Sequence, residues 1–213
     1  MKRFLGLTPL LALTIVGCAG QPPGSAPHDM SAADHKKHAA THESEAEQHE
    51  AAYDPDAEKR RGGSQTFQDF QYGQEVYNPT SKHLGHAEEH QETADAHRKA
   101  AEALESFTDG ECAKFPPKTR SVCPIMSVVT AAEDVKGGAK LTLKDGGPTD
   151  AVLAHMRCHH AFAAQEGHKG MPGCPLYLKN LELNADGKSI TITSEDNATE
   201  KEIRKRSKAH VHK

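Results

Sequence analysis

The chain has 213 residues, 26% of them charged, and a formal net charge of −4 at pH 7. Because positive and negative side chains are interspersed, the charge pattern argues against a nucleic-acid-binding protein. Residues 19–103 are mostly Ala, Glu, Gln, His, Asp and Lys, whereas residues 107–206 contain most of the Val, Ile and Leu found beyond residue 18. We expect only this second part to bury a core that offsets the entropy lost on folding.

The N-terminus has the parts of a bacterial lipoprotein signal. Lys2 and Arg3 precede an apolar run over residues 4–16, which is too short to span a bilayer. Ile15-Val16-Gly17-Cys18 then places two apolar residues and a small one before a cysteine. This segment resembles a lipobox, which implies removal of residues 1–17 as a signal peptide and acylation of Cys18, palmitate included. Each buried CH₂ of an acyl chain contributes about 0.8 kcal/mol, so several chains hold a polar protein on a membrane.

The residue after Cys18 bears on localisation. It is Ala19 rather than Asp, and by resemblance to sorted lipoproteins this favours the outer membrane, facing the periplasm, in a cell with two membranes. The sequence has no second apolar run of spanning length. We therefore expect the lipid at Cys18 to make the contact with the membrane.

Two matched histidine ladders follow the signal. The first four histidines are spaced by three, four and seven residues, and the second four repeat these spacings 48 residues later. The members are His35, His38, His42 and His49 in the first ladder and His83, His86, His90 and His97 in the second. We expect a His-rich arm, helical or partly disordered, in which residues 18–52 hold the lipidated tether and first helix, residues 53–80 a connector and residues 81–108 the second helix.

The ladders support two interpretations that do not exclude each other. At 100° per residue the second ladder falls within a sector of about 60° on one helix face. Ala87, Ala94, Ala101 and Leu104 lie along or beside that sector, which is typical of a seam in a helical hairpin or coiled coil. Converging imidazoles also suit Zn, Cu or Ni, because neutral histidine is the commonest metal ligand.

Residues 109–208 contain a second duplication. Cys123-Pro124-Ile125 and Cys174-Pro175-Leu176 lie 51 residues apart, and each precedes a strand, a tight turn, a second strand and a helix. The first helix is expected over residues 149–165, and the second over residues 198–208 with Asn197 and Glu200 as a capping box. The pattern predicts an α+β fold, ββαββα, with a four-stranded antiparallel sheet and both helices on one face. Residues 209–213 are predicted to be a tail.

Four cysteines follow Cys18 in a chain expected in an oxidising compartment, where disulfides are the default. Three pairings of Cys112, Cys123, Cys158 and Cys174 can be written. Disulfides between Cys112 and Cys123 and between Cys158 and Cys174 are favoured, because each would close a short loop. Two structural disulfides are favoured over four thiolate ligands, because the chain has no CxxC pair typical of zinc ribbons.

The first predicted C-terminal helix carries a second candidate metal set, namely His155, Met156, His159 and His160. The helical period places His159 towards the core, where a lone histidine is usually hydrogen bonded. Nearby histidines and methionines would suit copper, with Cys158 as an added ligand if it is reduced. A Cys158–His159 catalytic pair is disfavoured, because adjacent helical residues point about 100° apart. No other catalytic constellation is apparent, and we expect a protein that is not an enzyme.

The blocks FPPKTRSVCP, HMRCHHAF and GMPGCPLYL, together with the lipobox and His-rich helices, make the chain similar to His-rich envelope lipoproteins of Gram-negative bacteria. This resemblance implies an outer-membrane or periplasmic lipoprotein and brings no activity or ligand with it. Two functional hypotheses follow. The chain either binds or buffers Zn, Cu or Ni through its His-rich helices, or it serves as a structural or interaction module with an envelope protein partner and no metal.

Overall fold

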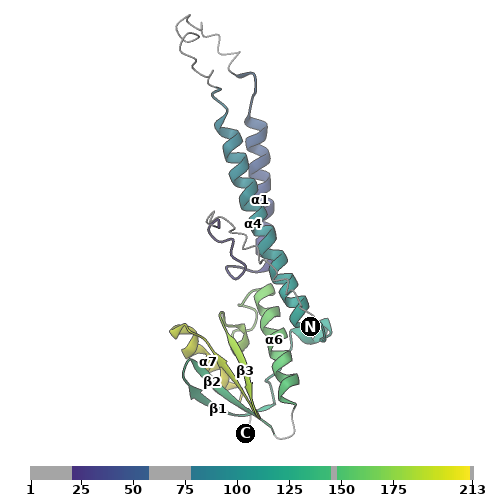
Figure 1. Cartoon of the computed structure of the whole chain (residues 1–213), viewed down its shortest axis with the longest axis vertical. Helices are drawn as coiled ribbons and strands as arrows, with labels where there is room; N and C mark the ends of the chain where they lie inside the picture. Colours follow the sequence, from purple (N-terminus) through teal and green to yellow (C-terminus); the bar gives the residue numbers. More distant parts are fainter. Residues whose placement is uncertain (1–20, 58–77, 145–147, 212–213) are drawn as a thin grey trace, which may run out of the picture.

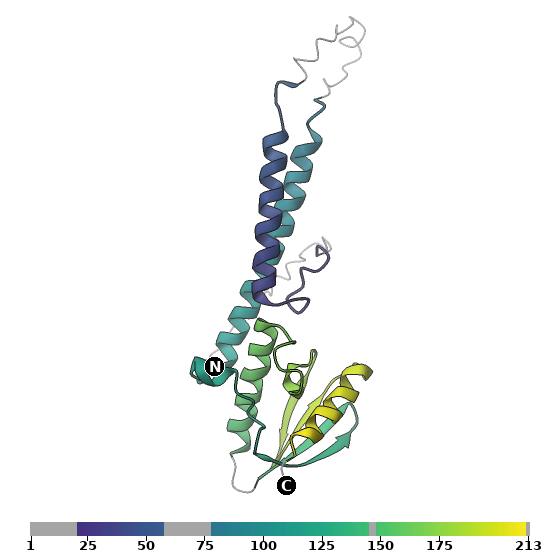
Figure 2. The same ribbon diagram turned by 180° about the vertical axis from the view of Figure 1, so that it is seen from behind.

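The computed structural model describes residues 21–57, 78–144 and 148–211. The signal peptide and Cys18 lie outside these residues. Two long helices form a hairpin that projects from an α+β domain (Figure 1), and the view from behind in Figure 2 shows the same two parts. Among the described residues, the structure has no helix with both the length and the apolar character needed to cross a membrane.

The hairpin consists of α1 (Ala32–Ala52) and α4 (Lys82–Glu111). These segments form helices because Ala, Glu, Lys and Gln have high helix propensity and no Pro interrupts them. The Oγ of Ser31 caps α1 by accepting a hydrogen bond from the Asp34 amide. The helices run side by side and antiparallel, which confirms the predicted hairpin. Helix α4 continues to Glu111, beyond the predicted end at residue 108, and its last turns pack against the α+β domain.

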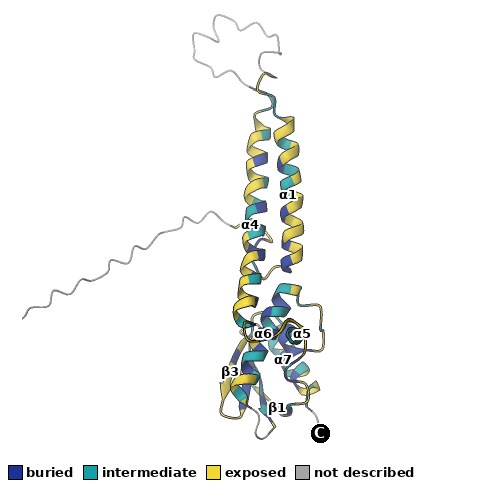
Figure 3. Cartoon of the chain, turned by 90° about the vertical axis from the view of Figure 1, so that its right-hand side faces the viewer, coloured by how far each residue is buried: buried dark blue, intermediate teal, exposed yellow. Residues whose placement is uncertain are grey.

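Small residues line the seam between the two helices. Six buried alanines contribute to it: Ala32, Ala39, Ala46, Ala87, Ala94 and Ala101. Figure 3 shows buried positions along the facing sides of α1 and α4, whereas their outer sides are exposed. Because alanine side chains are short, the two backbones approach closely enough for the histidines between them to meet.

The sheet of the C-terminal domain has the strand order β1-β2-β4-β3 and is antiparallel throughout. Its strands are β1 (Val129–Val135), β2 (Gly138–Leu143), β3 (Glu182–Asp186) and β4 (Ser189–Thr193). The two duplicated hairpins therefore meet through their second strands at the centre. A two-residue turn joins β3 to β4, and its first residue, Gly187, has a φ of +59° that suits glycine. The predicted α+β fold is confirmed.

Helices α6 (Thr149–Glu166) and α7 (Asn197–Ala209) cover one face of this sheet. Helix α6 of the first half packs mainly over β3 of the second half, and α7 of the second half packs over β1 and β2. Each half therefore supplies the cover of the other, which ties the duplicated units into one core. The predicted capping box of α7 is wrong in detail: the cap is Asp196, whose carboxylate accepts from the Thr199 amide.

The hairpin is covalently joined to the domain by a disulfide between Cys112, at the end of α4, and Cys158, in α6. The hydroxyl of Thr108 in α4 also donates a hydrogen bond to the Ala161 carbonyl in α6. The local pairing expected from the sequence, Cys112–Cys123 and Cys158–Cys174, is therefore wrong. The reason is the tertiary packing: α4 and α6 lie side by side and bring Cys112 to Cys158, although the two residues are far apart in the chain. Cys123 and Cys174 are buried and free.

Candidate metal centre

Three pairs of histidines cross the seam between α1 and α4. In each pair the two Nδ1 atoms face each other, at 2.9 Å in the first pair, 3.1 Å in the second and 3.0 Å in the third. The pairs are His35 with His97, His42 with His90, and His49 with His83. We call them the proximal, central and distal layers, in order of distance from the α+β domain. The spacing of seven residues, or two helical turns, repeats the same geometry three times.

These distances are those of a hydrogen bond between two nitrogen atoms. One imidazole donates its Nδ1–H, and the other accepts with the lone pair of its Nδ1. In such a hydrogen bond one proton lies between the two Nδ1 atoms of the layer. A metal ion that replaces the shared proton would be bound by both Nδ1 lone pairs, so the layers form a series of two-nitrogen sites along the hairpin.

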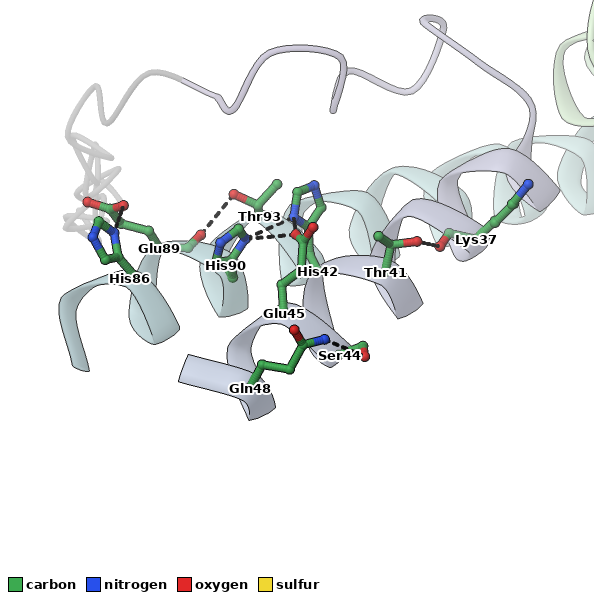
Figure 4. Close-up of polar contacts among 10 residues, drawn as sticks. All are labelled: Lys37, Thr41, His42, Ser44, Glu45, Gln48, His86, Glu89, His90 and Thr93. Atoms are coloured by element: carbon green, nitrogen blue, oxygen red, sulfur yellow. Dashed lines mark hydrogen bonds and ion pairs between the residues drawn. The ribbon is translucent and has the colours of Figure 1, made fainter. Parts of the chain in front are cut away.

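The central layer has a third donor. The Oε2 atom of Glu45, one helical turn after His42, lies 2.9 Å from His42 Nδ1 and 3.1 Å from His90 Nδ1. Figure 4 shows the carboxylate of Glu45 pointing between the two imidazole rings. These three donor atoms come from both helices and converge on one point, so the central layer is the best-developed candidate metal site among the described residues of the hairpin.

The separations fit the size of a transition-metal coordination sphere. Zn–N and Zn–O bonds of about 2.0–2.1 Å put neighbouring ligand atoms about 3.3 Å apart in a tetrahedron and about 2.9 Å apart in an octahedron. The three atoms of the central layer are 2.9–3.1 Å apart. The site therefore needs only small side-chain shifts to take an ion, and three protein ligands leave further positions for water.

The remaining two histidines of the ladders flank the outer layers. The ring of His38 stacks on His97 at a centroid distance of 5.3 Å, and that of His86 lies 5.2 Å from His49. Their Nδ1 atoms are not part of the three facing pairs, and His86 Nδ1 lies 3.4 Å from a carboxylate oxygen of Glu89. All eight predicted histidines thus lie on or beside the seam, six in facing pairs and two as exposed neighbours.

Burial between the helices shifts the protonation of two of these imidazoles. Desolvation lowers the pKa of His97, and the adjacent rings of His35 and His38 lower it further. Desolvation also lowers the pKa of His49, followed by the effect of His86 and His83. Both shifts favour the neutral imidazole, which is the form that binds metal.

The structure does not bring the predicted copper set of α6 together. His155 Nε2 donates to the Thr119 carbonyl at 3.0 Å, and His160 Nδ1 donates to the Leu176 carbonyl at 2.9 Å. Met156 is fully buried in the apolar core, and the sulfur of Cys158 is held in the disulfide. Within the described residues, His159 alone of this set has a ring nitrogen grouped with other potential metal ligands, the sulfurs of Cys123 and Cys174.

Sequence reasoning missed two residues that the structure places beside candidate ligands. Glu45 is three residues after His42, a spacing that puts both on one helix face, but the second ladder has Thr93 at the equivalent position. His210 was assigned to the tail, although it lies 51 residues after His159, the same interval that separates Cys123 from Cys174. The shared interval was the signal that could have identified it.

Comparisons of the chain with models of protein families, with curated proteins and with solved structures found no match. The functional argument therefore depends on the geometry of the sites.

Proposed function

We propose that this chain is a metal-binding protein whose helical hairpin holds Zn²⁺, Cu²⁺ or Ni²⁺ in its histidine layers, with the central layer as the principal site. The observation that supports this most directly is the convergence of His42 Nδ1, His90 Nδ1 and Glu45 Oε2, each 2.9–3.1 Å from the others. An imidazole-rich set with one carboxylate suits these borderline ions better than Mg²⁺ or Ca²⁺.

The proposed role is reversible binding rather than catalysis. The central layer is half-exposed, and its three ligands leave coordination positions for water or an exchanging ligand. Binding would be strongest at neutral pH and would weaken as the imidazoles protonate below about pH 6.5. We further propose that the chain is anchored by lipid at Cys18 in the outer membrane, so that the metal would be held at the periplasmic surface. Loss of membrane fractionation in a Cys18→Ala variant tests this anchor.

A structural role without metal is the second candidate. Each layer is already satisfied by a hydrogen bond between its two imidazoles, and ion pairs such as Lys36 with Glu105 add cross-helix contacts. In that case the hairpin would be a spacer that holds the α+β domain, and an envelope protein partner, away from the membrane.

Calorimetric titration of the metal-free protein with Zn²⁺, Cu²⁺ and Ni²⁺ distinguishes the two candidates. We expect binding by the wild type and at least ~10-fold weaker binding by a His42→Gln/His90→Gln variant, which keeps side chains of polar character at the seam. Since the loss of an outer-sphere partner alone costs about 10–100-fold in metal affinity, Glu45→Gln should also weaken binding. The matched control is Glu47→Gln, which makes the same change at an exposed position of α1.

Electron paramagnetic resonance of the Cu²⁺-loaded protein provides a structural readout. Hyperfine coupling to two equivalent nitrogens in the wild type, lost in the His42→Gln/His90→Gln variant, would support Cu²⁺ binding by the central layer. Binding of all three ions that is unchanged in the His42→Gln/His90→Gln variant would leave the spacer as the better account of the hairpin.

A further inference from the structure

A second cluster of metal-binding side chains lies inside the α+β domain, far along the chain from the histidine ladders. It contains two cysteines and two histidines contributed by four separate segments. Cys123 precedes β1, Cys174 precedes η1 (Pro175–Tyr177), His159 is in α6 and His210 is at the C-terminal end of α7. Cys123 is 4% exposed, Cys174 1% and His159 0%, so the cluster belongs to the core rather than the surface.

The donor atoms of Cys123, Cys174 and His159 converge, and His210 contacts the first of them. The Sγ atoms of Cys123 and Cys174 are 3.5 Å apart, and Cys123 Sγ is 3.7 Å from His210 Nε2. A ring nitrogen of His159 lies within 4.8 Å of both sulfurs. For tetrahedral zinc, bond lengths of about 2.3 Å to sulfur and about 2.0–2.1 Å to nitrogen place two sulfurs about 3.8 Å apart and sulfur and nitrogen about 3.6 Å apart. The separation of the two sulfurs and that of Cys123 Sγ from His210 Nε2 are therefore close to those of a tetrahedral site. His159, within 4.8 Å of both sulfurs, and His210, which contacts Cys123, would complete the site by side-chain movement.

Both histidines are held in the orientation that a metal ligand requires. His159 Nδ1 donates to the Arg120 carbonyl at 2.8 Å, and His210 Nδ1 donates to the Arg206 carbonyl at 2.8 Å. A proton on Nδ1 leaves the lone pair on Nε2, which is the arrangement that backbone carbonyls impose on metal-binding imidazoles. Within the described part of the chain, the buried Nε2 of His159 has no hydrogen-bond partner. Such an orphaned acceptor is costly unless something binds it.

The duplication of the domain generates this cluster. Cys174 follows Cys123 by 51 residues, and His210 follows His159 by the same 51 residues. Each half therefore supplies one cysteine before its strands and one histidine on its helix. Because the two halves exchange helices across a shared sheet, the two cysteines meet between them, and each half places its histidine beside at least one of these sulfurs.

We propose that Cys123, His159, Cys174 and His210 form a closed tetrahedral site for one Zn²⁺ that stabilises the α+β domain. Two sulfurs and two imidazole nitrogens in a tetrahedron are typical of structural zinc. Two thiolates balance the charge of the ion, so the buried complex is neutral and avoids the cost of an uncompensated interior charge. Binding releases the two thiol protons. The disulfide pairing supports the assignment, because Cys112 and Cys158 are bridged to each other and leave these two thiols free.

This site is independent of the one proposed for the hairpin. It uses sulfur ligands, is closed to solvent on most sides and has no position left for exchange, so it would hold its ion more permanently. The two sites can therefore be tested on the same full chain, because only the cysteine site produces thiolate-to-metal charge-transfer absorption.

The test substitutes Co²⁺ into the metal-free, mildly reduced full chain, after alkylation mapping has shown Cys112–Cys158 bridged and the other two thiols free. We expect a thiolate-to-cobalt band in the near ultraviolet and intense visible d–d bands typical of a tetrahedral ion, both displaced by one equivalent of Zn²⁺. His42→Gln/His90→Gln should leave these bands unchanged, whereas Cys123→Ser/Cys174→Ser should abolish them. His155→Gln, one turn from His159 on the same helix, is the matched control and should keep them.

A milder variant covers the case in which the double cysteine variant does not fold. His210→Gln changes a half-buried residue at the end of α7, and it should weaken Zn²⁺ binding at this site at least ~10-fold, since even outer-sphere changes cost about 10–100-fold. Its thiolate band should persist with altered d–d bands. Absence of a thiolate band with both thiols free, or equal Zn²⁺ affinity in wild type and His210→Gln, would overturn the proposal.

Discussion

Removal of the Cys112–Cys158 disulfide should destabilise the protein substantially. The bridge joins residues 46 positions apart, and the loss of unfolded-chain entropy for a loop of this length corresponds to about 4 kcal/mol at 25 °C. Both cysteines are fully buried, so a Cys112→Ala/Cys158→Ala variant also loses some packing. For a chain of this size, about 4 kcal/mol corresponds to a fall in Tm of about 8–16 °C.

The measurement is urea unfolding followed by circular dichroism, in a chelating buffer that keeps both proteins metal-free. Cys123→Ala/Cys174→Ala is the matched control, because it removes two buried sulfurs that form no bridge. We expect the free energy of unfolding of the bridge variant to lie about 4 kcal/mol below that of the control, since only the former loses loop closure. Equal values for the two variants, or a larger loss in the control, would refute the pairing and the reasoning from it.

Three further results are expected. Acidification below about pH 6.5 should lower the melting temperature of the metal-free protein. The pKa values of His97 and His49 are lowered in the folded state, so the unfolded chain binds more protons in that range and is favoured. Identical melting temperatures at pH 7.5 and pH 5 would contradict this. Ala94→Leu should cost about 1–3 kcal/mol of unfolding free energy by overpacking the fully buried seam, and an unchanged urea midpoint would show that the helices are not closely packed there. Gly138→Ala should destabilise the protein, because the added Cβ would lie 2.0 Å from a carbonyl oxygen of β4. Gly110→Ala, which has open space around it in α4, should instead stabilise the protein by about 0.5–1 kcal/mol. Urea midpoints that shift in the same direction for both variants would contradict these two predictions.

The hairpin could be predicted because its information is local. The seven-residue spacing between His35, His42 and His49 defines one helix face by the helical period alone. The second ladder repeats that spacing, and matched faces indicate that two helices pack together. Which histidine meets which could not be read from the spacing, because antiparallel packing reverses the order and sets His42 opposite His90 rather than any other partner. Glu45 acquires its role only through that register.

In the α+β domain, too, local patterns could be predicted from the sequence and long-range packing could not. Alternating strands, a Gly-containing turn and a helix in each half are short-range patterns, and they were sufficient to predict the ββαββα order and the single-sided cover of the sheet. The exchange of helices between the halves was not predicted, because it depends on how two apolar faces pack in space.

The cysteines separate the two kinds of information most clearly. The sequence by itself determined that four cysteines follow Cys18, and the 51-residue repeat relates Cys123 to Cys174. The sequence favoured disulfides between cysteines close in the chain, because the number of residues between two cysteines sets the entropy cost of closing the loop. Only the tertiary structure decided otherwise: the packing of α4 on α6 brings Cys112 to Cys158, and the pairing of the two halves brings Cys123 and Cys174 to His159. A side chain's partner is set by which elements share a core, and residues distant in the chain supply that core.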